Sequence, residues 1–147
     1  MRKRIAVING PNMNLLGKRE PSLYGTITLE EINNNLRTLG EELSCDLIFA
    51  QSNYEGELVD FIQKNMEYID GIVINPAGFS KTGYCILDAL EAVDIPYIEV
   101  HMTNIFDRGE KHRDTVFHEN AVGVLVGLKE IVYDLGVRGI VEYLDKL

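Results

Sequence analysis

RIAVIN, residues 4–9, is a short apolar run that passes at Asn9 into the polar sequence GPNMN. An apolar run of this length, stopped by glycine and proline, is typical of a strand that is buried on both faces of a sheet. Comparable runs recur along the chain, at residues 45–50 (CDLIFA), 71–75 (GIVIN), 97–101 (YIEVH) and 122–126 (VGVLV). We therefore expect five strands that pair in parallel.

Segments with helical spacing separate these runs. The clearest helix begins at Thr28, because Thr28 and Glu31 have the spacing of a capping box and apolar residues recur every three or four positions after them. Further helices are expected at residues 55–66, 82–93 and 128–147, and residues 10–25 are expected to form a long polar loop. The alternation predicts an α/β fold: one domain, residues 1–147, with a doubly wound five-stranded parallel sheet and helices on both faces.

The composition excludes several classes of function. The 147 residues are 46% hydrophobic and carry a net charge of −9, and a surface this acidic repels phosphate backbones, so nucleic-acid binding is not expected. The chain has no apolar stretch of about 20 residues, which predicts no membrane span. The opening MRKRIAVING is too short in its apolar part for a signal peptide, so we expect a cytoplasmic protein.

The sequence also gives little indication of a metal or nucleotide site. Cys45 and Cys85 belong to no Cys-x-x-Cys or Cys/His motif, so we expect no metal and two reduced, mostly buried thiols. NGPNMNLLG matches neither the dinucleotide-binding nor the Walker pattern. Ser80, Lys81 and Thr82, at the start of a predicted helix, offer amide groups and charge to an anion, although an ordinary helix cap is the competing interpretation.

Polar and basic side chains gather where the predicted strands end. Ligands of an open parallel sheet bind at the carboxyl ends of its strands. Residues that could bind or transfer protons follow the first, third and fourth strands: Asn12, Lys18, Arg19 and Tyr24; then Asn75, Ser80 and Lys81; then Thr103, Arg108, Lys111, His112 and Arg113. We expect one site for a small molecule at this edge.

Glu99 and His101 form one candidate pair. They are two residues apart on a predicted strand, so both side chains point to the same face. A carboxylate beside an imidazole can orient the ring and favour its protonated form. The alternative is a polar pair that merely caps a strand end, and the position at the carboxyl end favours the functional interpretation.

Arg19 and Tyr24 form a second candidate pair. A phenol has an ordinary pKa of about 10 and is a weak base at neutral pH, but a nearby guanidinium stabilises the phenolate. The competing interpretation is an arginine and a tyrosine that pack on the surface of a loop. Some fifteen residues without obvious structure suggest a lid, and this favours the functional interpretation slightly.

The sequence resembles the type II 3-dehydroquinate dehydratases over essentially its whole length. The matching segments are INGPNMNLLGKREPSLYG at residues 8–25, QSNYEGEL at 51–58, IVINPAGFSKT at 72–82, Asp88, and IEVHMTNI at 98–105. The resemblance implies a flavodoxin-like fold. It also implies a cofactor-free reaction of the shikimate pathway, the anti elimination of water from 3-dehydroquinate through an enolate to give 3-dehydroshikimate.

The same resemblance implies roles for individual residues. Tyr24 is the base that removes a proton from the carbon beside the ketone, with Arg19 favouring the phenolate. Asn12, through a water molecule, stabilises the enolate. His101 protonates the departing hydroxyl, and Glu99 orients His101.

Further residues are implied to bind the substrate. Asn75 contacts a hydroxyl, while Thr103 takes the place of a serine and binds the carboxylate together with backbone amides such as that of Met102. Members of the family usually form homododecamers, as tetramers of trimers, and Asp88 is expected to reach the site of a neighbouring subunit. No metal is implied.

Three departures from the family pattern concern recognition of the substrate. Lys81 stands where a histidine is usual, and Gly83 where a serine is common. His112 occupies the position of a clamping arginine, although a one-residue slip, made plausible by Gly109, would place Arg113 there instead. Lysine can still donate a hydrogen bond, but it is longer than histidine and fully charged.

Two other hypotheses remain open at this stage. One is a related enzyme that dehydrates a different polyhydroxy acid, which the altered recognition residues would allow. The other is a flavodoxin-like binding module without catalysis, which would need a phosphate loop or an exposed apolar patch.

Overall fold

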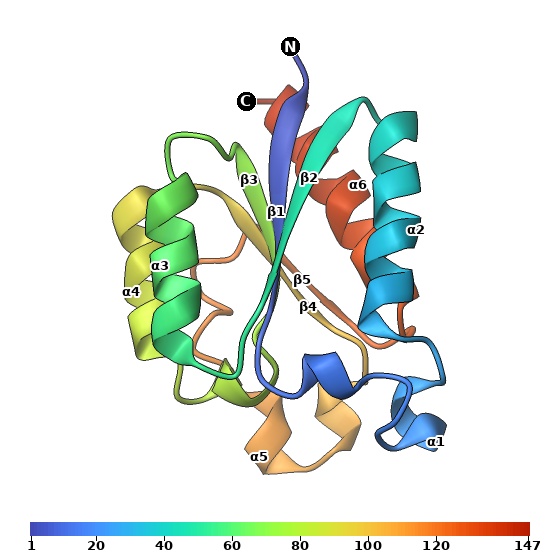
Figure 1. Ribbon diagram of the computed structural model, residues 1–147. Helices are drawn as coiled ribbons and strands as arrows, with labels where there is room; N and C mark the ends of the chain where they lie inside the picture. The colour runs from blue at the N-terminus through green and yellow to red at the C-terminus, as the bar shows by residue number, and fades with distance from the viewer.

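The five predicted strands form a single sheet in which every neighbouring pair is parallel. The computed structural model describes residues 1–147, and the strand order is β2-β1-β3-β4-β5 (Figure 1). This is the order of the doubly wound, flavodoxin-like arrangement, which confirms the predicted fold class. The strands are β1 (Lys3–Asn9), β2 (Cys45–Gln51), β3 (Gly71–Asn75), β4 (Tyr97–His101) and β5 (Gly123–Val126).

Two helices cover each face of the sheet. Figure 1 shows α2 (Leu29–Glu42) and α6 (Ile131–Asp145) on one side, and α3 (Glu55–Asn65) and α4 (Tyr84–Val93) on the other. The central strand β1 serves both layers: Ile5 and Val7 pack into the core under α2 and α6, whereas Ala6 and Ile8 pack into the core under α3 and α4. Both faces of the strand are therefore apolar, which explains its unbroken apolar run.

The chain between the strands is more ordered than the sequence indicates. The expected loop at residues 10–25 contains a 3-10 turn, η1 (Met13–Leu15), and a short helix, α1 (Pro21–Tyr24). A second 3-10 turn, η2 (Ala77–Ser80), precedes α4, so that helix begins at Tyr84 rather than at residue 82. Two further short elements, η3 (Ile105–Asp107) and α5 (Glu110–Arg113), follow β4.

The last helix is shorter than predicted. It begins at Ile131, because Leu128 and Lys129 have φ angles of +67° and +53°, which no right-handed helix contains. No helix has the length and apolar character needed to cross a membrane. Cys45 is buried as expected, but the prediction is wrong for Cys85, which is exposed in the first turn of α4.

The loops that follow β1 and β3 approach each other closely. Asn9 and Asn75, the last residues of these strands, are in register, and the backbone N–H of Gly10 donates to the carbonyl of Asn75 over 2.9 Å. A Cβ atom on Gly10 would lie 2.1 Å from the carbonyl oxygen of Pro76, so only glycine fits here. This contact fixes the edge of the sheet where the predicted site residues lie.

The predicted capping box of α2 is present and gives a test of local stability. Thr28 Oγ1 accepts from the backbone N–H of Glu31, and the Glu31 carboxylate accepts from the backbone N–H of Thr28. We expect Thr28→Ala to lower the free energy of unfolding in urea by about 1 kcal/mol, because one helical N–H loses its partner. Thr38→Ala, in the exposed interior of the same helix, is the control and should have little effect. An equal loss in both variants would contradict the assignment of the cap.

Candidate active site

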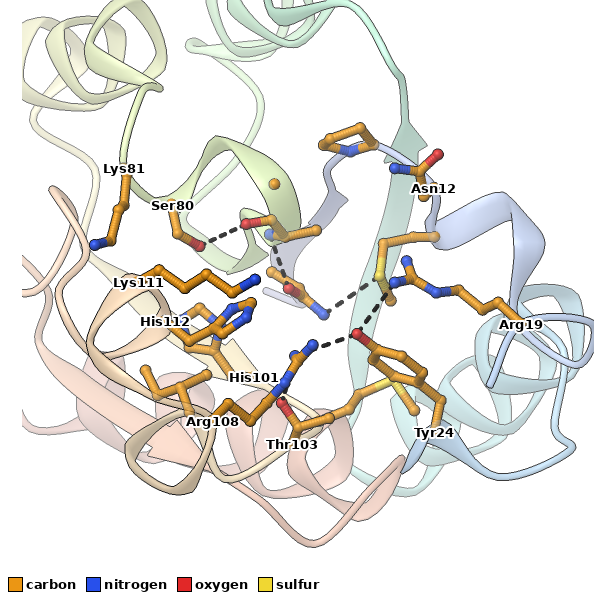
Figure 2. Close-up of a pocket in the computed structure, with 17 residues that line it drawn as sticks. Asn12, Arg19, Tyr24, Ser80, Lys81, His101, Thr103, Arg108, Lys111 and His112 are labelled. Atoms are coloured by element: carbon orange, nitrogen blue, oxygen red, sulfur yellow. Dashed lines mark hydrogen bonds between the residues drawn. The ribbon is translucent and has the colours of Figure 1, made fainter. Parts of the chain in front are cut away.

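A pocket of about 290 Å³ opens at the carboxyl ends of β1, β3 and β4 (Figure 2). Its walls come from the loop after β1, from η2 and from the segment after β4. Its volume suits one small molecule. Of the residues expected in the site, Asn12, Arg19, Tyr24, Asn75, Lys81, His101, Met102, Thr103 and His112 line the pocket, whereas Glu99, Asp88 and Arg113 do not.

Two guanidinium groups meet at the hydroxyl of Tyr24. Arg19 Nη2 donates to it over 3.2 Å and Arg108 Nη1 donates over 3.3 Å (Figure 2). The Arg19 group also lies over the ring, with its Cζ 4.4 Å from the centroid. Tyr24 is buried at the end of α1, a helix whose start is fixed by a proline at its first position. The phenol oxygen therefore accepts hydrogen bonds from two cationic groups.

Arg108 is a member of the site to which the sequence analysis gave no specific role. It comes from the end of η3, and its Nη1 donates both to Tyr24 and to the hydroxyl of Thr103, the latter over 3.1 Å. Arg108 belongs to the basic segment after β4, but nothing in that segment distinguishes it from its basic neighbours. The contact joins residues that are 84 positions apart, which no local pattern could indicate.

His101 and Glu99 form the pair that their spacing predicts. His101 Nε2 lies 2.5 Å from Glu99 Oε2, and both side chains point to the face of the sheet that also holds Tyr97. Glu99 is completely buried behind His101, while His101 itself reaches the pocket. The carboxylate therefore holds the imidazole from behind and does not contact a ligand.

The Glu99 carboxylate has two further partners that the sequence analysis missed. Thr115 Oγ1 donates to Oε2 over 2.6 Å, and His118 Nδ1 lies 2.7 Å from Oε1. Burial alone would raise the pKa of Glu99, but the hydrogen bonds from His101 and Thr115 and the charges of the two histidines lower this pKa below its ordinary value. Glu99 is therefore ionised at neutral pH.

Asn75 and Asn12 are held in different ways. Asn75 is buried at the end of β3, where its amide nitrogen donates to the hydroxyl of Tyr133 over 3.0 Å and its oxygen accepts from the backbone of Ala77. Asn12 has a left-handed conformation, with φ of +66°, and its backbone N–H donates to the side chain of Asn53. The side chain of Asn12 remains free at the mouth of the pocket (Figure 2).

Two of the residues that depart from the family pattern, Lys81 and His112, lie on the rim of the pocket, whereas Gly83 does not line it. Lys81 Nζ donates to the backbone carbonyl of Glu110, over 3.2 Å, and so connects the segment after η2 to the start of α5. His112 lines the pocket, and burial together with the charges of Arg108, Lys111 and Lys81 lowers its pKa.

Besides Glu99, two other expected residues lie outside this pocket. Arg113 is exposed and absent from the pocket lining, and its role as the clamping arginine stays a prediction. Asp88 is exposed on the outer surface of α4, and a contact with a neighbouring subunit stays a prediction.

The arrangement separates a candidate base from a candidate acid. Tyr24 and Arg19 come from the segment after β1 and Arg108 from the segment after β4, whereas His101 and Glu99 come from the end of β4. Lys81, Lys111 and His112 add further cationic or basic groups, while no aspartate or glutamate lines the pocket. This charge pattern suits a small anion that undergoes proton transfer. No group of three or more His, Cys, Asp or Glu side chains is placed to hold a metal ion.

Comparison with known proteins gives consistent matches along the chain. The sequence model of the family described as dehydroquinase class II matches residues 3–141. A protein from Prochlorococcus marinus (strain NATL1A), named 3-dehydroquinate dehydratase, is 46% identical over 143 residues, which are 97% of this chain and 99% of that protein. A protein of the same name from Aliarcobacter butzleri (strain RM4018) is 42% identical over 98% of this chain and 88% of its own length.

A solved structure agrees with these sequence matches. The crystal structure of the type II dehydroquinase from Butyrivibrio crossotus DSM 2876 superimposes with a TM-score of 0.91 at 35% sequence identity. The superposition covers 95% of this chain and 97% of that one.

The lowered pKa of Glu99 predicts how stability depends on pH. A carboxylate with a depressed pKa in the folded state contributes stability that is complete above its ordinary pKa of 4.5 and is lost as the pH falls through the folded value. We expect Glu99→Gln to lower the free energy of unfolding at neutral pH by about 1–3 kcal/mol. In this variant the free energy of unfolding should also fall less steeply than in the wild type as the pH is lowered from neutral. Glu119→Gln, an exposed neighbour, should keep the wild-type pH dependence. Urea unfolding between pH 3 and 7 measures both, and parallel curves for wild type and Glu99→Gln would contradict the role of Glu99.

Proposed function

The chain belongs to the dehydroquinase class II family, and on this premise we propose how its residues carry out the reaction. The protein is a 3-dehydroquinate dehydratase, a hydro-lyase of the shikimate pathway. The observation that carries the proposed mechanism is the placement of Tyr24, with two guanidinium groups on its hydroxyl, in the same pocket as the His101–Glu99 pair.

Tyr24 is the proposed base. Its phenolate oxygen takes the proton from the carbon beside the ketone of 3-dehydroquinate, and the electron pair of the broken C–H bond moves onto the ketone oxygen as an enolate. Arg19 and Arg108 stabilise the phenolate before the transfer, because each donates a charge-assisted hydrogen bond to that oxygen. Asn12, whose side chain is free at the pocket mouth, stabilises the enolate through a water molecule.

His101 is the proposed acid. The enolate electrons return to form the carbon–carbon double bond of 3-dehydroshikimate, and the hydroxyl leaves with a proton from the imidazole, as water. Nε2 of His101 faces Glu99, so Nδ1 is the ring nitrogen without a partner in the chain and the one available to the leaving group. Atoms and charge balance without a cofactor, because the proton that Tyr24 gains and the proton that His101 loses complete one elimination.

Substrate binding is assigned to groups that the fold already orients. Thr103 Oγ1 accepts from Arg108, so its own hydrogen is free to donate to the substrate carboxylate beside the backbone amide of Met102. Asn75 binds a ring hydroxyl. Lys81 uses one of its hydrogens on Glu110 and keeps two for a ligand.

His112 takes the recognition role in place of a clamping arginine, because Arg113 lies outside the pocket. A neutral imidazole both donates and accepts, so it can bind a ring hydroxyl without adding charge. The proposal also includes a cytoplasmic protein that assembles as a dodecamer, with the exposed Asp88 reaching the pocket of a neighbouring subunit.

The base assignment is tested with the natural substrate. The product is a conjugated enone, so turnover of 3-dehydroquinate is followed in the near ultraviolet. We expect Tyr24→Phe to lower kcat by at least 10³-fold, the order of an essential acid or base, while substrate binding measured by calorimetry changes little. Tyr84→Phe, at an exposed position of α4, should retain wild-type activity. Absence of turnover by the wild-type protein would contradict the activity itself, and persistent turnover by Tyr24→Phe would place the base elsewhere.

The role of Arg108 is tested separately. Removing one charge-assisted hydrogen bond from the phenolate costs about 1.5–3 kcal/mol, so we expect Arg108→Gln to lower kcat by roughly 10-fold to 150-fold. Arg138→Gln, which removes an exposed arginine that pairs with Glu42, is the control for net charge and should keep the wild-type rate. A change confined to KM in Arg108→Gln would mean that Arg108 serves binding alone.

A further inference from the structure

The buried carboxylate of Glu99 contacts a second histidine for which the proposed mechanism has no use. We propose that His118 is a positioning residue: it shares Glu99 with His101 and thereby sets how readily His101 gives its proton to the leaving hydroxyl. The inference rests on the proposed roles of Glu99 and His101, and it adds to them a residue that touches neither the pocket nor the substrate.

The two histidines bind opposite oxygens of the carboxylate. His101 Nε2 lies 2.5 Å from Oε2, and His118 Nδ1 lies 2.7 Å from Oε1. Thr115 Oγ1 donates to Oε2 over 2.6 Å, so three groups fix the plane of the carboxylate. No lysine or arginine forms an ion pair with Glu99, so these two imidazoles are the only groups in contact with it that can bring positive charge to a completely buried carboxylate.

The atoms that surround His118 indicate its protonation state. An ionised carboxylate only accepts hydrogen bonds, so Nδ1 of His118 must carry a hydrogen. The other ring nitrogen, Nε2, lies 3.3 Å from the backbone carbonyl of Arg113, which is also an acceptor. Only the imidazolium has a hydrogen on both nitrogens, and it is therefore the form that satisfies both partners.

His118 is anchored on one side and open to solvent on the other. Thr115 Oγ1 accepts from the backbone N–H of Phe117, whose side chain is completely buried and whose carbonyl accepts from Tyr97 over 2.5 Å. The side chain of His118 is 29% exposed, whereas those of His101 and Glu99 are 7% and 0% exposed. His118 can therefore exchange its proton with water, although the carboxylate that it contacts is completely buried.

The consequence for His101 follows from charge sharing. The titratable groups around Glu99 are His101, His118 and the phenol of Tyr97, which burial and the charge of Glu99 keep neutral by raising its pKa. When His118 carries a positive charge, that charge offsets part of the negative charge of Glu99. Glu99 then stabilises the protonated form of His101 less strongly. A less tightly held proton is a better acid for the leaving hydroxyl.

The test compares two substitutions that differ in charge. His118→Gln can still donate to Glu99 Oε1 but is always neutral, whereas His118→Lys keeps a positive charge. With 3-dehydroquinate as substrate, we expect the alkaline limb of the pH profile of kcat/KM to move up by about half a pH unit or more in His118→Gln, with a lower plateau of kcat. In His118→Lys the alkaline limb of this profile should lie at the same pH as in the wild type or at a lower pH. Glu119→Gln, the exposed neighbour, should leave both limbs unchanged.

A second readout separates this inference from the activity on which it rests. The chain has three histidines, His101, His112 and His118, so ring-proton NMR spectra with selective ¹³C labelling resolve each titration without substrate. The titration midpoint of His101 should rise in His118→Gln and should not rise in His118→Lys. An unchanged midpoint, or a uniform loss of rate at every pH in both variants, overturns the inference even where the wild type is active. If the wild type fails to dehydrate 3-dehydroquinate, the proposed function fails instead, and the NMR comparison still decides the coupling.

Discussion

The pairing of β1 with β3 is the constraint on which the functional part of the molecule depends. Asn9 and Asn75 end the two strands in register, and the hydroxyl of Tyr133 in α6 bridges them, donating to Asn9 over 2.5 Å and accepting from Asn75 over 3.0 Å. The bridge is completely buried, so breaking it would leave polar groups without partners. The loop after β1 and the turn η2 after β3 leave the sheet from this fixed pair of strands, and β4 adds His101 beside it.

The charge distribution explains how an acidic protein selects an acidic substrate. The chain carries a net charge of −9, yet the pocket lining contains two arginines, two lysines and two histidines and no carboxylate. The one carboxylate of the proposed mechanism, Glu99, is buried behind His101 and contacts two histidines, His101 and His118. A small anion is therefore attracted to the pocket and repelled by most of the remaining surface.

Regular structure made much of this site predictable from the sequence. The two-residue period of a strand places Glu99 and His101 on one face, and the capping spacing places Thr28 at the start of α2. Arg108 and His118 could not be found in this way, because both come from the irregular chain between β4 and β5, where no period indicates which side chain points inward. The sequence also left open whether His112 or Arg113 occupies the position of the clamping arginine. Both residues lie in a four-residue helix, which is too short to produce a periodic pattern.

The residues proposed for proton transfer and those proposed for substrate recognition lie on different kinds of structure: the former include strand residues, and the latter include residues of short helices and turns. His101 and Glu99 belong to a strand that is hydrogen-bonded on both sides, so a change there disturbs the sheet as well as the reaction. Lys81 and His112 depart from the family pattern. Lys81 follows η2, and His112 lies on α5. The Lys81 side chain connects the two segments, because its Nζ donates to the backbone carbonyl of Glu110 in α5. A substitution on such a rim alters one loop contact and leaves the carboxyl ends of the strands in place. This is the physical reason why the chain can differ at Lys81 and His112 and still hold Tyr24 and His101 in the same pocket.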